Sequence, residues 1–181
     1  RTRRPGVDTH FFRPASSTDP PRRPAWQRRR IVLAAGRLQK RKGFDVLIRA
    51  VAALRGVVPD VLLVVAGGGE EDAALRALAA DLGLDEHVSF LGEVSDEALR
   101  SCYQHCDVFV LANRQIGCDV EGFGMALLEA QACGKPVIAG GSGGTREALL
   151  DGVTGQVIDC TKPELVAAAL EALLGDAERR A

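Results

Sequence analysis

Six short apolar runs, each followed by a stretch with helical periodicity, most constrain what this 181-residue chain can fold into. The runs predict strands at 31–35, 61–67, 88–92, 108–112, 136–140 and 153–158, and the stretches predict helices at 43–55, 71–82, 95–105, 124–133, 143–150 and 162–174. Most runs lack strict alternation, as strands covered on both faces do. Six such repeats predict right-handed crossovers and an α/β fold, a doubly wound and mostly parallel six-stranded sheet with helices on both faces.

The first thirty residues differ in character from the rest. Residues 1–30 are rich in proline and arginine and show no helical or strand period, so they predict a linker or interdomain arm ahead of a domain at 31–181. The arginines could meet acidic lipid headgroups. Because they are not spaced as on an amphipathic helix, we favour a solvated linker or a surface that faces another domain.

Charge and hydropathy exclude several classes of protein. The formal net charge is −1, so no strong positive field favours a nucleic-acid partner. The longest apolar runs, such as VLLVVA, are too short to span a bilayer, and no signal peptide is visible. We therefore expect a cytoplasmic protein and leave open a peripheral attachment at the inner face of the membrane.

The cysteines favour a reducing compartment. There are five of them, an odd number at irregular spacing, which does not fit a disulfide framework. Cys102, His105 and Cys106 lie close enough in sequence to suggest a metal site, but they fall on a predicted helix and have no complementary pair elsewhere. We expect buried small side chains there and no metal.

In a doubly wound sheet the ligand site lies at the carboxyl ends of the strands, so the loops after the strands carry the motifs. The first of these loops, GRLQKRKGFD, lacks the G-x-G-x-x-G of a dinucleotide site. It offers Arg37 and Lys42 ahead of a helix that begins near Gly43. A planar guanidinium and a compact ammonium suit a diphosphate, and the alternative is a solvated basic loop.

The next loops bear on nucleotide chemistry. Gly67, Gly68 and Gly69 allow close backbone approach, but no Lys-Ser/Thr follows them, nor does it in ACGKPV, so neither segment is a P-loop. A plain turn is an equal alternative for the three glycines. After the third strand, Leu91 and Val94 bound a backbone that could meet the flat edge of a base.

The segment DVEGFGMALLEAQACGKPVIAGGSGG carries two acids around a glycine turn. Gly122 and Gly124 flank Phe123 where a loop enters a helix, whose first amides and dipole favour negative charge. Glu121 and Glu129 are separated axially by at most roughly 12 Å, about the span of a sugar–diphosphate–ribose unit. Carboxylates accept hydrogen bonds from vicinal hydroxyls. The alternative for Glu129, an exposed helix acid, fits poorly with its apolar neighbours.

These segments, with VVAGGGEED, FLGEVSDEAL and DGVTGQVID, resemble the carboxyl-terminal domain of retaining glycosyltransferases of family 4, which have the two-domain GT-B fold with Rossmann-like halves. The resemblance covers about residues 5–181. It implies that Arg37 and Lys42 bind the diphosphate of a nucleotide sugar, Glu121 the hydroxyls of the transferred sugar and Glu129 the ribose. It also implies that the backbone amides of 122–125, Met125 included, meet sugar and phosphate, and that no divalent metal is needed.

CDVEGFG and LEAQACGKPVIAGGSGG look like bacterial mannosyltransferases of phosphatidylinositol mannoside assembly, which implies a GDP-linked donor, with UDP sugars still open. The family's amino-terminal domain, which binds the acceptor, is missing, as is the family's histidine in that half. We therefore expect weak nucleotide-sugar binding and no transfer by this chain alone. A nucleotide-sugar epimerase and a non-catalytic binding module remain as alternatives.

Overall fold

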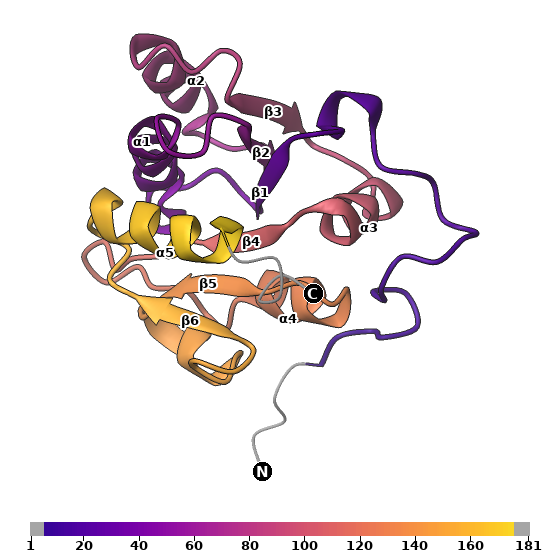
Figure 1. Cartoon of the computed structure of the whole chain (residues 1–181). Coiled ribbons are helices and arrows are strands. Elements are labelled where there is room, and N and C mark those ends of the chain that lie inside the picture. Colours follow the sequence, from indigo (N-terminus) through magenta and orange to yellow (C-terminus); the bar gives the residue numbers. More distant parts are fainter. Residues whose placement is uncertain (1–5, 176–181) are drawn as a thin grey trace.

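The computed structural model describes residues 6–175, which build one six-stranded sheet with helices on both sides (Figure 1). The five pairs of neighbouring strands are all parallel, and the strand order is β3-β2-β1-β4-β5-β6. The strands are β1 (Arg30–Ala35), β2 (Val61–Ala66), β3 (Val88–Gly92), β4 (Val108–Leu111), β5 (Val137–Gly140) and β6 (Gly155–Ile158). The helices are α1 (Phe44–Leu54), α2 (Asp72–Asp81), α3 (Asp96–His105), α4 (Met125–Ala132) and α5 (Pro163–Gly175). This order confirms the predicted doubly wound, Rossmann-like α/β fold.

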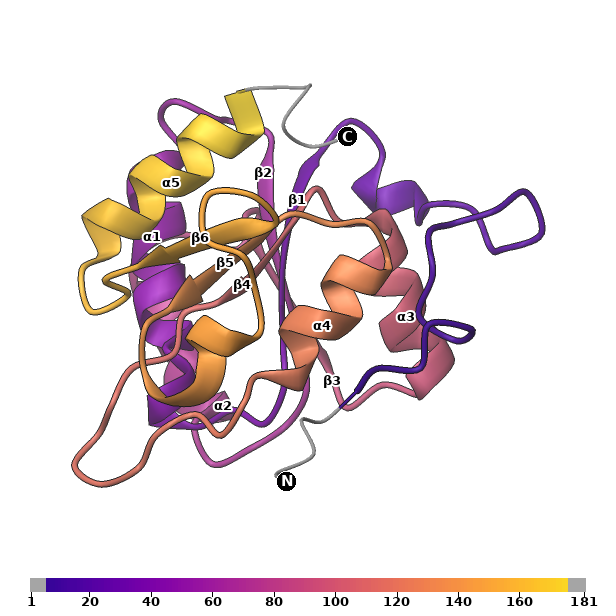
Figure 2. The ribbon, with the colours of Figure 1, turned by 90° about the horizontal axis from the view of Figure 1, so that it is seen from below.

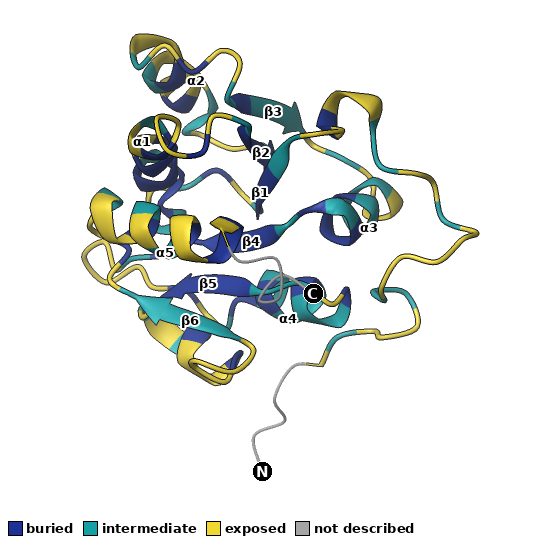
Figure 3. Ribbon diagram, viewed as in Figure 1, coloured by how far each residue is buried: buried dark blue, intermediate teal, exposed yellow. Residues whose placement is uncertain are grey.

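The sheet separates two apolar layers, because successive strand residues point to opposite faces. On β1, Val32 and Ala34 pack with α1, α2 and α5, whereas Ile31 and Leu33 pack with α3 and α4. Figure 2 shows the two helix layers on either side of the strands. Apart from Arg30 the inner strands are buried, and the edge strands β3 and β6 are mostly half-buried (Figure 3), as expected for a sheet covered on both faces.

The helix predicted at 143–150 is wrong. This segment forms a short 3₁₀ helix, η3, from Gly143 to Glu147. Gly143 has φ +67°, which an α-helix cannot contain, and the hydroxyl of Thr145 donates to the carbonyl of Gly140 at 2.6 Å. The side chain thus competes with helical hydrogen bonds and holds the segment in a tight turn.

The segment before the sheet, residues 6–29, packs on the domain as an ordered arm along α3 (Figure 1). Arg13 pairs with Asp19 at 2.7 Å inside the arm, and this pairing holds the pKa of the Asp19 carboxyl below its usual range. Phe12 packs edge-on against Tyr103 of α3, with ring centroids 5.9 Å apart. Trp26, in the 3₁₀ helix Pro24–Trp26, is buried in the α3–α4 layer.

Arginines near the end of the arm make contacts within the chain. Arg22 donates to Asp107 at 3.0 Å, and Arg29 donates to the carbonyl of Val61 at 2.9 Å. These contacts fix the entry into β1 and leave those guanidinium groups less available to a lipid surface. The arginines at positions 1, 3 and 4, and the chain end at 176–181, lie outside the described residues. Within 6–175 no helix has the length and apolar character needed to cross a membrane.

Candidate functional site

The loops after β1 and β4 meet at the carboxyl edge of the sheet, and a glycine makes this contact close. Gly43, at φ +68°, lies against β4's end, so that a Cβ there would fall 1.9 Å from the carbonyl oxygen of Ala112. Just before it, residues Lys40–Lys42 form a single 3₁₀ turn, η2. This packing brings the basic loop after β1 next to the acidic segment that precedes α4.

Four charged side chains form a connected group at this contact, here called the Glu121 cluster: Arg41, Lys42, Asp119 and Glu121. Glu121 is only 7% exposed, and its Oε2 accepts from Arg41 Nη1 at 2.6 Å and from Lys42 Nζ at 2.7 Å. The Nε of Arg41 also lies 3.1 Å from Oδ1 of Asp119. A nearly buried carboxylate is stable in this place because two cations neutralise it.

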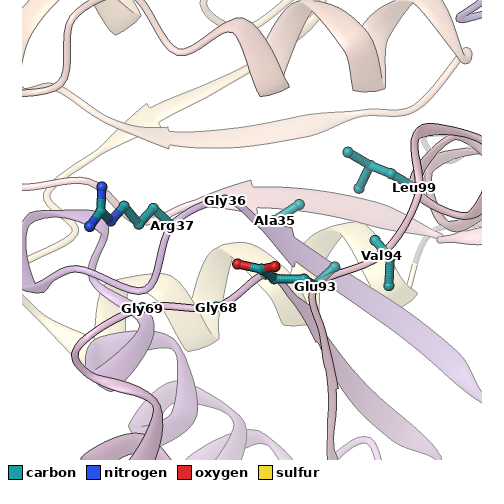
Figure 4. Close-up of a pocket in the computed structure, with 10 residues that line it drawn as sticks. Ala35, Gly36, Arg37, Gly68, Gly69, Glu93, Val94 and Leu99 are labelled. Atoms are coloured by element: carbon teal, nitrogen blue, oxygen red, sulfur yellow. The ribbon is translucent and has the colours of Figure 1, made fainter.

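A pocket of about 530 Å³ lies beside the cluster, at the carboxyl ends of β1, β2 and β3. Its two ends differ in chemistry (Figure 4): Arg37 stands at one end, while Val94 and Leu99 lie at the other. The rest of its lining is Ala35, Gly36, Ala66, Gly67, Gly68, Gly69 and Glu93. The Arg37 side chain is 73% exposed and reaches an acid only at 3.9 Å, in Glu70, so its donors remain free for an anion.

Lys42 links the pocket to the Glu121 cluster. A Cβ built on Gly36, which lines the pocket, would lie 3.8 Å from Lys42 Nζ, the same atom that contacts Glu121. A single ammonium therefore stands between the pocket and the buried acid. At φ +135° any residue larger than glycine would strain the backbone at position 36.

Glu129 lies on α4 and faces α3. Its Oε2 accepts a hydrogen bond of 2.8 Å from the hydroxyl of Tyr103. Burial raises the pKa of Glu129, the hydrogen bond from Tyr103 opposes that rise, and the charge of Asp96 adds to it. Glu129 is thus paired with a tyrosine on the neighbouring helix and is not a free surface acid. Leu99, one turn before Tyr103 on α3, lines the pocket.

The start of α4 supplies backbone donors. Gly124 has φ +79° and ends the loop directly before Met125, and among the described residues no side chain caps this helix. The amide of Leu127 donates to the carbonyl of Gly124 at 2.8 Å. The amides of Met125 and Ala126 come before the first intrahelical hydrogen bond, so they suit an anion or hydroxyl oxygens. Gly122 is exposed, whereas Phe123 packs on the α3–α4 layer.

A glycine-rich segment after β5 supports the loop that carries Glu121. A Cβ on Gly143 would lie 1.8 Å from the carbonyl oxygen of Glu121, and the amide of Gly144 donates to that oxygen at 3.2 Å. The buried side chain of Asn113 accepts from the amide of Gly140 at 3.1 Å and donates to the carbonyl of Ser142 at 2.8 Å. The position of Glu121 thus depends on backbone contacts with the 140–144 turn.

Replacing Asn113 by alanine is expected to lower the free energy of unfolding by about 1–3 kcal/mol, because the buried amide of Gly140 loses its partner and the carbonyl of Ser142 keeps only the Thr145 hydroxyl. Urea unfolding followed by circular dichroism measures this change. Gln115→Ala is the matched control: the Gln115 side chain is exposed and, within residues 6–175, hydrogen-bonds only the carbonyl of Gly117, so a loss below about 0.5 kcal/mol is expected. Equal losses in both variants would contradict a specific role for Asn113.

The structure brings some of the sequence-predicted residues together and separates others. Lys42 and Glu121 are in contact, Arg37 and Val94 line one pocket, and Glu129 lies beside α3. Leu91 packs on the α3–α4 layer and is not among the pocket-lining residues.

Sequence reasoning assigned no role to several residues of this region. They are Arg41, Glu93, Leu99, Tyr103, Asn113 and Asp119. Arg41 adjoins Lys42 in the same basic loop and Asp119 lies two positions before Glu121, and these adjacencies were the available signal. Tyr103 and Asn113 gave no local signal, because their roles come from contacts between distant segments.

Cys102, His105 and Cys106, at the end of α3, make separate contacts. Cys102 and Cys106 are buried, and burial raises the pKa of the Cys106 thiol to about 12. The Nε2 of His105 lies 2.9 Å from the carbonyl of Pro20 in the arm. Across residues 6–175 no group of three or more histidine, cysteine or acidic side chains is placed to hold a metal.

Comparison with known proteins gives consistent matches. The family model described as "Glycosyl transferases group 1" matches residues 17–181. A GDP-mannose-dependent alpha-(1-6)-phosphatidylinositol monomannoside mannosyltransferase of Mycolicibacterium smegmatis is 43% identical over 185 residues, covering 98% of this chain and 47% of that protein. The chain thus spans about half the length of this relative.

Two solved structures share the fold. One is the C-terminal domain of a glycosyl transferase group 1 family protein (LpcC) from Francisella tularensis, with a TM-score of 0.80 and 27% identity over 97% of this chain and 91% of the other. The other is Anabaena Alr3699/HepE in complex with UDP-glucose, with a TM-score of 0.81 and 26% identity over 97% of this chain and 48% of the other.

Proposed function

Because the chain belongs to the family of group 1 glycosyl transferases, we propose that it is the donor-binding domain of a retaining glycosyltransferase. The enzyme would move a hexosyl unit from a nucleoside diphosphate sugar to an acceptor glycan or glycolipid. One observation carries the proposal: a pocket with a cationic and an apolar end adjoins, through Lys42, a nearly buried carboxylate. The apolar end, the cations and the carboxylate follow one another in the same order as the base, the diphosphate and the sugar of the ligand.

In this proposal each part of the donor meets complementary chemistry. The base lies at the apolar end with Val94 and Leu99, and the diphosphate lies between Arg37, Lys42 and the first amides of α4. Glu121 accepts hydrogen bonds from the hydroxyls of the transferred sugar. Glu129 does the same for the ribose.

Catalysis in this proposal is electrostatic. As the bond between the sugar and the diphosphate breaks, negative charge grows on the leaving phosphate oxygen. Arg37, Lys42 and the amino end of α4 would stabilise that charge where it develops. Because these groups supply the positive charge, we propose that transfer needs no divalent metal.

GDP-mannose is the donor that we propose, because the relative from Mycolicibacterium smegmatis is named for its dependence on it. HepE, which was solved with UDP-glucose, makes UDP sugars the comparison ligands. The acceptor side is proposed to come from a second domain. A lipid-linked acceptor, as in that relative's name, would bring the protein to a membrane surface.

Calorimetry and thermal unfolding of the 181-residue chain with GDP, UDP and ADP and with their sugars test this proposal. At a GDP concentration about 100 times Kd, the melting temperature is expected to rise by roughly 5–10 °C, since binding to the folded state adds about 2.7 kcal/mol. Lys42→Ala should weaken binding at least tenfold, whereas Lys162→Ala, which removes an exposed lysine after β6, should not. If none of these nucleotides binds, the proposal is wrong.

Incubating the complete protein with labelled GDP-mannose separates the remaining alternatives. Label in an acceptor indicates transfer, and label in an epimeric nucleotide sugar indicates an epimerase. Binding with neither product indicates a non-catalytic module. We expect transfer.

A further inference from the structure

The chain's single tyrosine, Tyr103 on α3, contacts Glu129 on α4, one of the proposed donor-binding residues. Tyr103 is fully buried on α3, and its ring lies between those of Phe12 and Phe109, with centroid distances of 5.9 and 5.4 Å. The two phenylalanines meet the ring of Tyr103 edge to face, and its hydroxyl donates to Glu129. Rings packed on two sides leave the phenol little freedom to move.

This contact occupies one oxygen of the Glu129 carboxylate. Tyr103 donates to Oε2 at 2.8 Å, and no other hydrogen bond joins the Glu129 side chain to the described residues. A carboxylate has two oxygens and about four acceptor sites, so Oε1 retains its full capacity. Two vicinal hydroxyls need such a free oxygen in a fixed direction.

We propose that Tyr103 is a positioning residue for the donor: its hydroxyl holds the Glu129 carboxylate so that Oε1 faces the ribose hydroxyls. The inference rests on the function proposed above and adds a residue to its ribose site. A glutamate side chain has three rotatable bonds, and fixing it before the ligand arrives removes part of the entropy cost of binding. The location fits, since Leu99 lines the pocket one turn ahead of Tyr103 on the same helix.

The hydrogen bond also has a fixed direction. Burial raises the pKa of Tyr103 well above its ordinary value, so the phenol keeps its proton and remains the donor. The charged or titratable groups around Glu129 are Tyr103 and Asp96 from α3 and Cys133, which caps the end of α4. Among them only the phenol favours the ionised form of Glu129 by a hydrogen bond.

The first test compares nucleotides that differ only in the ribose. Affinities for GDP and 2′,3′-dideoxy-GDP are measured by calorimetry for the 181-residue chain and for Tyr103→Phe, Glu129→Ala and the double variant. Tyr103→Phe is expected to weaken GDP binding about tenfold, the worth of one hydrogen bond to a charged group, and dideoxy-GDP binding less than twofold. The double variant should bind GDP no more weakly than Glu129→Ala, because the two residues act in series.

A control separates positioning from general damage to the core. Cys102 precedes Tyr103 on α3 and is also fully buried, but no hydrogen bond joins it to Glu129 among the described residues, so Cys102→Ala should lower stability without changing the preference for GDP over dideoxy-GDP. Equal weakening of both nucleotides by Tyr103→Phe, or no weakening of either, would overturn the inference. So would a wild-type chain that binds the two nucleotides equally well.

A second readout needs no nucleotide. The ¹³C chemical shift of the Glu129 carboxyl carbon, followed against pH, gives its pKa in the free chain. Because Tyr103 lowers that pKa, Tyr103→Phe is expected to move the titration to higher pH, and Cys102→Ala is expected to leave it in place. An unchanged titration in Tyr103→Phe would overturn the inference. A wild-type chain that binds no nucleotide at all would instead remove the proposed function on which it rests.

Discussion

Replacing Gly143 by alanine is expected to lower the free energy of unfolding by about 3–5 kcal/mol, or to prevent folding altogether. Two effects add. At φ +67° any side chain is strained, and the new Cβ would lie 1.8 Å from the carbonyl oxygen of Glu121. Relief requires the loop before α4 to move, so Glu121 would leave Arg41 and Lys42. Urea unfolding measures the loss of stability, and GDP-mannose binding measures the effect of displacing Glu121.

Two other glycines separate these effects. Gly152 also has positive φ, at +75°, but a Cβ there meets nothing within 4 Å, so Gly152→Ala should cost only about 1 kcal/mol. Gly56 has neither feature, and Gly56→Ala should be neutral within about 0.5 kcal/mol or stabilising. If Gly143→Ala proved no worse than Gly152→Ala, the close contact beneath Glu121 would not constrain the loop.

If the complete protein transfers sugar as proposed, replacing Glu121 by glutamine is expected to reduce its kcat/KM about 100-fold or more. The amide has the size of the carboxylate but lacks its charge. It accepts weaker hydrogen bonds from sugar hydroxyls, and it leaves Arg41 and Lys42 with one neutral oxygen between them. The measurement is initial-rate kinetics with the nucleotide sugar varied.

Binding of GDP alone provides the internal control, since it lacks the sugar. Glu121→Gln is expected to change GDP affinity only a few-fold. Asp119→Asn removes the more exposed acid that contacts Arg41, 60% exposed, and should reduce transfer no more than a few-fold. If Glu121→Gln kept more than half of the wild-type kcat/KM, the assigned role of this residue would be wrong.

The fold could be predicted from the sequence because its signals are local. Runs such as IVLAA and VLLVVA are too apolar for exposed strands and too short for helices, and their regular alternation with helical stretches leaves few topologies. The failure at 143–150 has a physical reason. The helical pattern of apolar residues there is outweighed by the left-handed conformation of Gly143 and by hydrogen bonds of Thr145 to carbonyls of the preceding turn.

The site could be predicted only in part. The rule that ligands lie at the carboxyl ends of parallel strands points to the loops that carry Arg37, Lys42 and Glu121, and to the helix after the last of them, which carries Glu129. The partners of these residues do not follow. The contact of Tyr103 with Glu129 joins residues 26 positions apart, and that of Arg41 with Glu121 joins residues 80 positions apart. Such pairs depend on packing between elements, which no local pattern records.

The Glu121 cluster has a consequence for how a polyanion could enter the neighbouring pocket. Lys42 stands between Gly36 and Glu121, so phosphate oxygens near Gly36 would compete with the acid for its ammonium. If Lys42 were its only partner, losing the ammonium would leave the nearly buried Glu121 carboxylate unpaired, at high energetic cost. Arg41 contacts the same oxygen, Glu121 Oε2, at 2.6 Å and provides a second positive charge beside it. Because two cations contact Glu121, Lys42 can bind an incoming ligand while Arg41 still neutralises the Glu121 carboxylate.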